Sequence, residues 1–189
     1  DSFESNGSIL GQHPDMTKVP GIEASTGSLG HGLSIGIGMA LSCKIESLDN
    51  KVFVLLGDGE CEEGSIWEGI ITAANLSIDN LVVIVDNNHL QILDTISNSA
   101  KNLEPIDRKF KEFGWEVRNI DGHNIHEIYD TLSSVPFVKN RPSCIVADTV
   151  KGKGLSFAEN ELLWHYRKLS DDEYNNGITE LNDRYLNST

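Results

Sequence analysis

The chain has 189 residues, of which 39% are hydrophobic, enough for one globular core. Asp and Glu number 29 against 15 Lys and Arg, so the formal net charge is −14 at neutral pH. A field of that sign repels nucleic-acid backbones, and no apolar run approaches the roughly 20 residues of a membrane span. Composition and charge therefore argue against nucleic-acid binding and against a membrane protein.

The three cysteines, Cys43, Cys61 and Cys144, are too few and too scattered for a disulfide framework or a zinc site. Reduced thiols are typical of intracellular proteins. The chain begins at Asp1, and no secretory signal is visible. We therefore expect a cytoplasmic location.

Helical patterns and short apolar runs alternate along the chain. The runs are rich in Val, Ile and Leu without strict alternation, as in parallel strands covered on both faces. In chain order, the pattern predicts a helix over Leu29–Ser47, a strand over Val52–Leu56, a helix over Ser65–Asn75, strands over Leu81–Val85 and Glu116–Ile120 separated by a helix over Ile106–Phe113, a helix over Asn124–Ser133, a strand over Cys144–Ala147, and a last helix opened by a capping box at Ser170–Glu173. This order predicts an α/β fold with an open, mostly parallel sheet and helices on both faces.

Polar residues follow the first two predicted strands. Gly57-Asp58-Gly59 comes after the first, and Asn88, 30 positions beyond Asp58, comes after the second. Adjacent parallel strands bring both side chains to one edge, where ligands of such sheets bind. Carboxylate and amide oxygens suit Mg²⁺ or Ca²⁺, and the glycines let backbone approach a phosphate. These residues predict a metal-bridged diphosphate, the alternative being a simple turn and a strand-end cap.

The Gly-Asp-Gly and Asn pair resembles the thiamine diphosphate signature, and the flanking motifs resemble those of transketolases from His13 to His165. The matching runs are Ala24–Gly32, Leu55–Glu60, Glu63–Glu68, Leu81–Leu90, Phe113–Trp115, Asp121–His123, Thr149–Gly154 and Trp164–His165.

This resemblance implies the roles of individual residues. Mg²⁺, for which Ca²⁺ is a possible substitute, would be held by Asp58, Asn88 and the backbone carbonyl of Leu90. His13 and His165 would be catalytic, contacting the substrate and handling its protons. Thiamine diphosphate would contact Gly27, Leu29, Gly57, Asp58, Gly59, Asn88, Gln91, Ile92, Lys151 and His165, with Gly59 donating its N–H to the diphosphate.

Other positions have open or structural interpretations. Glu63 and Glu68 lie in the family on an acidic path between active sites, but they could equally be exposed carboxylates at a helix start. His31 is either a polar residue beside the cofactor or a surface residue. His89 stands where many relatives have Gly or Arg and receives no role. The two remaining histidines, His123 and His126, are interpreted as structural.

The resemblance implies a transketolase subunit that moves a two-carbon ketol unit between sugars or sugar phosphates. We expect residues 1–189 to form one diphosphate-side domain, lacking an N-terminal helical segment and the pyrimidine-side domain. A separate partner chain would supply the latter, in a dimer or heterotetramer, as in split transketolases. The alternatives are another thiamine diphosphate enzyme, of the 2-oxoacid dehydrogenase or deoxyxylulose-phosphate synthase type, and a non-catalytic subunit.

Overall fold

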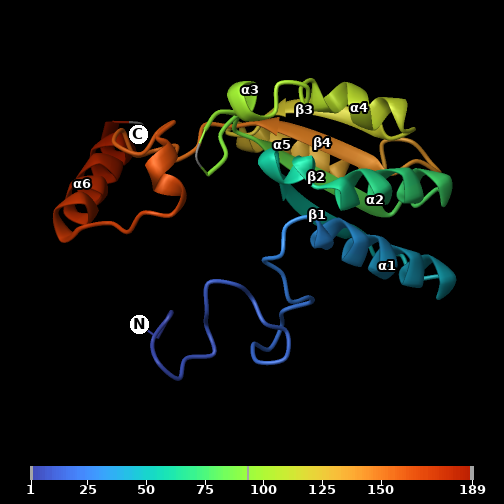
Figure 1. The fold of residues 1–189 in the computed structure, drawn as a ribbon, viewed down its shortest axis with the longest axis horizontal. Helices are drawn as coiled ribbons and strands as arrows, with labels where there is room; N and C mark the ends of the chain where they lie inside the picture. The colour runs from blue at the N-terminus through green and yellow to red at the C-terminus, as the bar shows by residue number, and fades with distance from the viewer. Residues whose placement is uncertain (1, 93, 188–189) are drawn as a thin grey trace.

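A four-stranded sheet lies at the centre of the computed structural model, which describes residues 2–92 and 94–187 (Figure 1). The strands are β1 (Val52–Gly57), β2 (Leu81–Asn87), β3 (Glu116–Asp121) and β4 (Ser143–Asp148), in the order β1-β2-β4-β3. Every neighbouring pair is parallel. The predicted open parallel sheet is confirmed.

Helices cover both faces of this sheet, as predicted. On one face, α1 (His31–Ile45), α2 (Gly64–Asn75) and α4 (Ile106–Glu112) enclose the larger apolar cluster with β1, β2 and β4. On the other face, α5 (Ile125–Ser133) packs against β3 and β4 with a smaller cluster. The remaining helices are α3 (Ile96–Ser99), α6 (Asp171–Asn187) and two 3₁₀ turns, η1 (Gly59–Glu62) and η2 (Leu162–His165). None of the described helices is long and apolar enough to cross a membrane.

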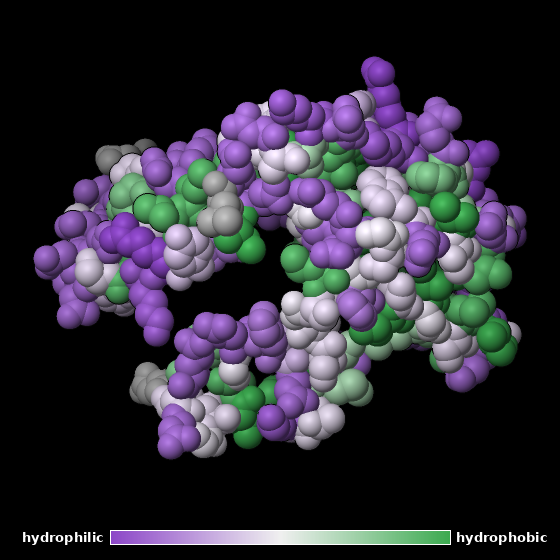
Figure 2. Space-filling view, viewed as in Figure 1, coloured by the Kyte–Doolittle hydropathy of each residue, from purple (hydrophilic) through white to green (hydrophobic). Residues whose placement is uncertain are grey.

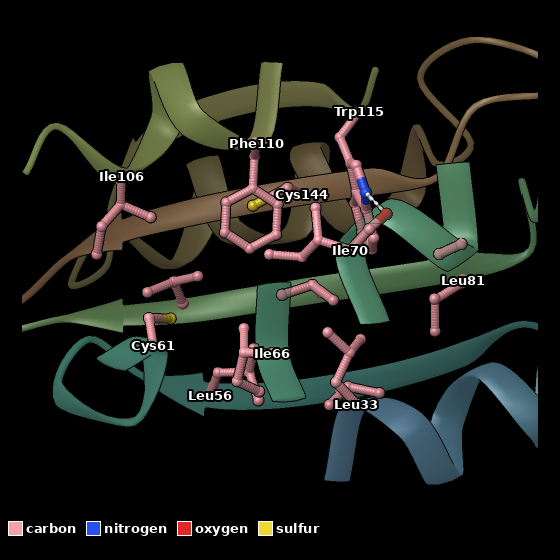
Figure 3. Close-up of a cluster of buried hydrophobic side chains, with 14 of the residues drawn as sticks. Leu33, Leu56, Cys61, Ile66, Ile70, Leu81, Ile106, Phe110, Trp115 and Cys144 are labelled. Carbon is pink, nitrogen blue, oxygen red and sulfur yellow. Dashed lines mark hydrogen bonds between the residues drawn. The ribbon is translucent and has the colours of Figure 1, made fainter. Parts of the chain in front are cut away.

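The larger cluster centres on aromatic and aliphatic side chains from elements far apart in the sequence (Figure 3). Phe110 and Trp115 pack edge to face with ring centroids 5.3 Å apart. The Trp115 indole N–H donates to the carbonyl of Ile70 at 2.9 Å, so its one polar group is satisfied in the core. The cluster thereby joins α2 to α4 and the start of β3.

The prediction that all four strands are covered on both faces is wrong for β1. Val54 and Leu56 are buried beneath α1 and α2, whereas Phe53 and Leu55 on the opposite face are 49% and 70% exposed. The reason is that α5 contacts β3, at the far edge of the sheet from β1. Because Phe and Leu are apolar on either face, the sequence of β1 does not show that one face is open.

Two predicted helix starts are confirmed by their caps, and one is displaced. Asn124 accepts from the backbone N–H of Glu127 ahead of α5, and Ser170 and Glu173 bond reciprocally ahead of α6. By contrast, α1 begins at His31, two residues later than predicted, because Gly30 has a left-handed backbone with φ of 83°.

The packing of α1 on β1 requires a glycine at one position of that helix. A Cβ added at Gly36 would lie 2.4 Å from Cγ2 of Val54, whereas one added at Gly38 would meet nothing within 4 Å. We predict that Gly36→Ala lowers the free energy of unfolding by about 1–3 kcal/mol through overpacking. Gly38→Ala, the matched control in the same helix, should raise it by about 0.5–1 kcal/mol. Urea denaturation measures both, and equal effects would contradict the close contact.

Candidate functional site

Asp58 is the buried centre of the carboxyl edge of the sheet. It follows β1, and the residue is only 2% exposed. Oδ1 accepts from the N–H of Gly59 at 2.7 Å, and Oδ2 accepts from the N–H of His89 at 2.6 Å. Burial raises the pKa of the carboxyl, although these two hydrogen bonds act in the opposite direction. A cation beside Asp58 would offset that cost of burial.

The loop after β2 brings the other predicted metal ligands to Asp58. Asn88 Oδ1 accepts from the N–H of Leu90 at 3.0 Å, and Leu90 forms an isolated antiparallel bridge with Thr95. His89 between them donates its own N–H to Asp58. The parallel register, in which Gly57 pairs with Asp86, explains why the two loops meet. The loop that carries Asn88 and Leu90 is thus held against Asp58 through His89.

This donor set fits a metal ion bound together with a phosphate group. In the parts of the chain that the structure describes, no three His, Cys, Asp or Glu residues form a metal cluster. One carboxylate, one amide and one carbonyl would leave the other positions of Mg²⁺ to phosphate oxygens and water, as Mg²⁺ commonly requires. A Cβ at Gly57 would meet nothing within 4 Å, so there is open space beside the turn. Asn87 Oδ1 nearby is buried without a hydrogen-bond partner among the described residues.

Of the two predicted cofactor residues after Leu90, one lies beside the Gly-Asp-Gly turn and the other is exposed. Gln91 lies beside the Gly-Asp-Gly turn, because a Cβ at Gly59 would be 3.1 Å from Cβ of Gln91. Ile92 is 48% exposed. The Gly59 N–H, expected to donate to the diphosphate, donates to Asp58 in this structure. Contact with a phosphate would therefore require that hydrogen bond to be shared or redirected.

Glu60 is a structural member of this edge that sequence reasoning missed. Its Oε1 accepts from the N–H of Gly30 at 2.9 Å and its Oε2 from the N–H of Gly57 at 3.3 Å. Ser65 Oγ adds a bond to the carbonyl of Gly30 at 2.9 Å. Glu60 thereby ties the glycine-rich turn before α1 to the Gly-Asp-Gly turn. The only signal in the sequence was its place directly after that motif.

The glycine-rich turn also holds His13. A Cβ at Gly27 would lie 2.5 Å from Cγ of His13, so the imidazole packs directly on the glycine. Gly27 has φ of 123°, a second reason for glycine at this position. Leu29 on the same turn is 53% exposed. Both predicted cofactor residues of this turn line a cleft of about 440 Å³ beside α1 and β1.

Lys151 and His165 form a further group in the segment after β4. Partial burial lowers the pKa of the His165 imidazole, and the positive charge of Lys151 lowers it further. Figure 2 shows a hollow between this C-terminal segment, the N-terminal segment and the sheet, which in Figure 1 lies beyond the carboxyl ends of the strands. The predicted residues thus come from three segments that border one hollow.

The structure adds little to the interpretation of the two glutamates at the start of α2 and of the remaining histidines. Glu63 and Glu68 are both exposed, in agreement with either interpretation. His31 Nδ1 lies 3.2 Å from the carbonyl oxygen of Leu29. His123 accepts from the N–H of Val150 through Nε2 at 2.7 Å, which agrees with a structural role.

Residues 1–182 match the family model described as transketolase, thiamine diphosphate binding domain. The chain belongs to this family. Within it, the chain is 39% identical over 184 residues to one of the subunits of the apulose-4-phosphate transketolase of Phocaeicola vulgatus, covering 97% of this chain and 65% of that protein. It is also 39% identical over 181 residues to the 6-deoxy-6-sulfo-D-fructose transketolase subunit SqwG of a Clostridium species, covering 96% of this chain and 66% of that protein. The chain therefore spans about two thirds of the length of these relatives.

Solved transketolases share the fold. The Campylobacter jejuni enzyme superposes with a TM-score of 0.89 at 26% identity, covering 96% of this chain and 29% of that one. A Pichia stipitis transketolase in complex with sedoheptulose 7-phosphate gives a TM-score of 0.78 at 23% identity, covering 98% and 32%. The chain thus has the fold of solved transketolases over nearly its whole length.

The proximity of Lys151 to His165 generates a prediction about proton affinity. Removing the positive charge in Lys151→Met should raise the pKa of His165 only part of the way to its ordinary value, because partial burial, the larger cause, remains. An NMR pH titration of the His165 ring protons, assigned with His165→Asn, measures the change. Lys153→Met removes the same charge two positions further along the same loop. An equal shift in both variants would show that Lys151 has no specific effect.

Proposed function

We propose that this chain binds thiamine diphosphate with Mg²⁺ and forms the diphosphate side of a transketolase active site. The observation that carries the proposal is Asp58, a buried carboxylate that joins both strand-end loops in a member of the thiamine diphosphate-binding family. Burial raises the pKa of Asp58, so its charged form is unfavourable in the protein alone. A cation in the open space beside the turn would stabilise that charge.

Each predicted residue then has a task at the bound cofactor. Asp58, Asn88 and the Leu90 carbonyl would hold the Mg²⁺, and Lys151 would face the diphosphate. The glycine-rich turn, through Gly27 and Leu29, and the residues Gly57, Gly59, Gln91 and Ile92 would line the rest of the cofactor. The cofactor supplies the carbon nucleophile, as thiamine chemistry requires.

The two histidines would move protons of the substrate. His165 has a lowered pKa, so its imidazole is neutral at neutral pH and can accept a proton. His13 packs on Gly27 of the glycine-rich turn before α1. Together they would hold the hydroxyl and carbonyl groups of a ketose or ketose phosphate. The relatives named for apulose 4-phosphate and 6-deoxy-6-sulfo-D-fructose support a sugar of this kind.

A partner chain would complete the active site. The curated relatives are named as subunits of transketolases, which supports a second polypeptide that supplies the pyrimidine side. The hollow bordered by three segments is open on one side in Figure 2, where such a partner could reach the cofactor. We propose a heteromer, a dimer or heterotetramer, and a cytoplasmic location in agreement with the three free cysteines.

The metal site is tested by Asp58→Asn and Asp58→Ala. Both variants should lose Mg²⁺-dependent binding of thiamine diphosphate, with affinity falling at least about 100-fold because the principal anionic ligand is gone. Isothermal titration calorimetry with and without Mg²⁺ measures the affinity, and circular dichroism verifies the fold. Asp130→Asn, which alters an exposed carboxylate of α5, is the control. Unchanged binding by Asp58→Asn would remove the central support for the site.

The activity is tested by mixing this chain with the chain encoded beside it, thiamine diphosphate and Mg²⁺. We expect transfer of a two-carbon ketol unit from xylulose 5-phosphate to ribose 5-phosphate, measured by separating the sugar phosphates, or transfer from another ketose in a panel of donors. Decarboxylation of 2-oxoacids instead would indicate a different thiamine diphosphate enzyme. Tight cofactor binding without any turnover by the mixture would indicate a non-catalytic subunit.

A further inference from the structure

His89 occupies the one position between two predicted metal ligands, Asn88 and Leu90, and its side chain reaches out of that loop. We propose that His89 is a positioning residue, which through Asp148 fixes the spacing between the metal-side loop after β2 and the loop after β4 that carries Lys151. This inference rests on the proposed function for its consequence in cofactor binding. The bridge itself is a feature of the chain without cofactor.

The backbone of His89 is fixed at both of its polar groups. Its N–H donates to Asp58 Oδ2 at 2.6 Å, and its carbonyl accepts from the N–H of Ile96 at 3.0 Å. Its φ of 62° lies in the left-handed region, which non-glycine residues adopt uncommonly and in which Asn, Asp and His are the most frequent exceptions. Because histidine tolerates this backbone, the interaction that is specific to this position must be sought in its ring.

That interaction holds the imidazole between two carboxylates. Nε2 lies 3.0 Å from Oδ1 of Asp148, within hydrogen-bond distance. Nδ1 lies 3.6 Å from Oε1 of Glu104, an oxygen that is buried without any hydrogen-bond partner among the described residues. Glu104 is itself anchored, since its Oε2 accepts from the N–H of Ile106 at the start of α4. The ring thus bridges the end of β4 and the segment leading into α4.

The bridge lies where the backbone ladder between β2 and β4 ends. Asn87 and Asp148 are the last paired residues of β2 and β4, and one further backbone bond joins Thr149 N–H to the Asn87 carbonyl at 3.2 Å. Beyond that point the segments are joined by side-chain hydrogen bonds. Thr149 Oγ1 donates to Asp86, and His123 accepts from the N–H of Val150 at 2.7 Å. His89 contacts the side chain of Asp148, the last residue of β4, three positions before Lys151.

A bound diphosphate would contact the metal ion and the Lys151 ammonium group at once, so these two positive groups must lie at a fixed separation. Asn88 and Leu90 flank His89, so the His89–Asp148 bond links the metal-side loop to the last residue of β4, from which the loop with Lys151 begins. His89 is 54% exposed and Asp148 is 74% exposed, so the effect should be moderate. The bond therefore sets position rather than global stability.

The bridge is tested first without cofactor, by hydrogen exchange of the backbone amides. His89→Gly relieves the left-handed backbone and removes the ring, and Asp148→Asn removes the charged acceptor. Each should speed exchange at Thr149 and Val150 about threefold or more, as expected for local opening. His126→Ala, which removes an exposed imidazole on α5, should not. Unchanged exchange in both bridge variants would overturn the proposal.

The consequence is tested by calorimetric binding of thiamine diphosphate at saturating Mg²⁺. His89→Gly and Asp148→Asn should each raise Kd about three- to tenfold, while the melting temperature without cofactor stays within about 2 °C of wild type. The double variant should bind no more weakly than either single variant, because both remove one interaction. His89→Gln, whose amide nitrogen can reach the place of Nε2, should restore much of the affinity.

The outcomes distinguish this inference from the proposed function. If the wild-type chain binds thiamine diphosphate and His89→Gly binds equally well, or if the two single effects add in the double variant, His89 is not a positioning residue. If the wild-type chain binds no thiamine diphosphate at all, the proposed function fails, and the exchange rates alone decide whether the bridge exists.

Discussion

The buried carboxylate of Asp58 is the constraint on which the carboxyl edge of this fold depends. It accepts one hydrogen bond from its own turn and one from the loop after β2, so two loops separated by 30 residues share one acid. Burial raises the pKa of that acid, which means that the folded chain without a cation holds its charge at a cost. A metal ion at this position would lower that cost and would strengthen the join between the loops.

The parallel sheet makes such a join possible. In register, β1, β2 and β4 end side by side, and their exit loops emerge at one edge. The backbone ladder then stops, and side chains such as Glu60, Thr149 and His123 continue the connections between neighbouring segments. The apolar layer of α1, α2 and α4 beneath the sheet keeps the strands in this register. The site is therefore tied by hydrogen bonds at the strand ends and becomes more open toward the N-terminal and C-terminal segments (Figure 2).

Most of the fold and the first layer of the site could be predicted from the sequence because their signals are local. Apolar runs indicated the strands, and Asn124 and Ser170 capped the helices that they were predicted to begin. The Gly-Asp-Gly turn and Asn88 were predicted to meet because both follow adjacent strands. The connections of Glu60 and His89 could not be predicted, since their partners lie up to 59 residues away and depend on which loops the sheet brings together. The exposed face of β1 was missed for a similar reason, because burial depends on where α5 packs.

The charge of the chain explains why the placement of single cations matters here. With a net charge of −14, the protein as a whole repels an anionic cofactor, so attraction must come from groups held close to it. Lys151 is proposed to be such a group, and its positive charge also lowers the pKa of His165 in the segment after β4. An exposed cation more than roughly a Debye length of 8 Å from the cofactor would attract it only weakly, because salt screens the charge. The contacts that hold the β4 exit loop in place are consequently part of the electrostatics of the site, as much as the lysine itself.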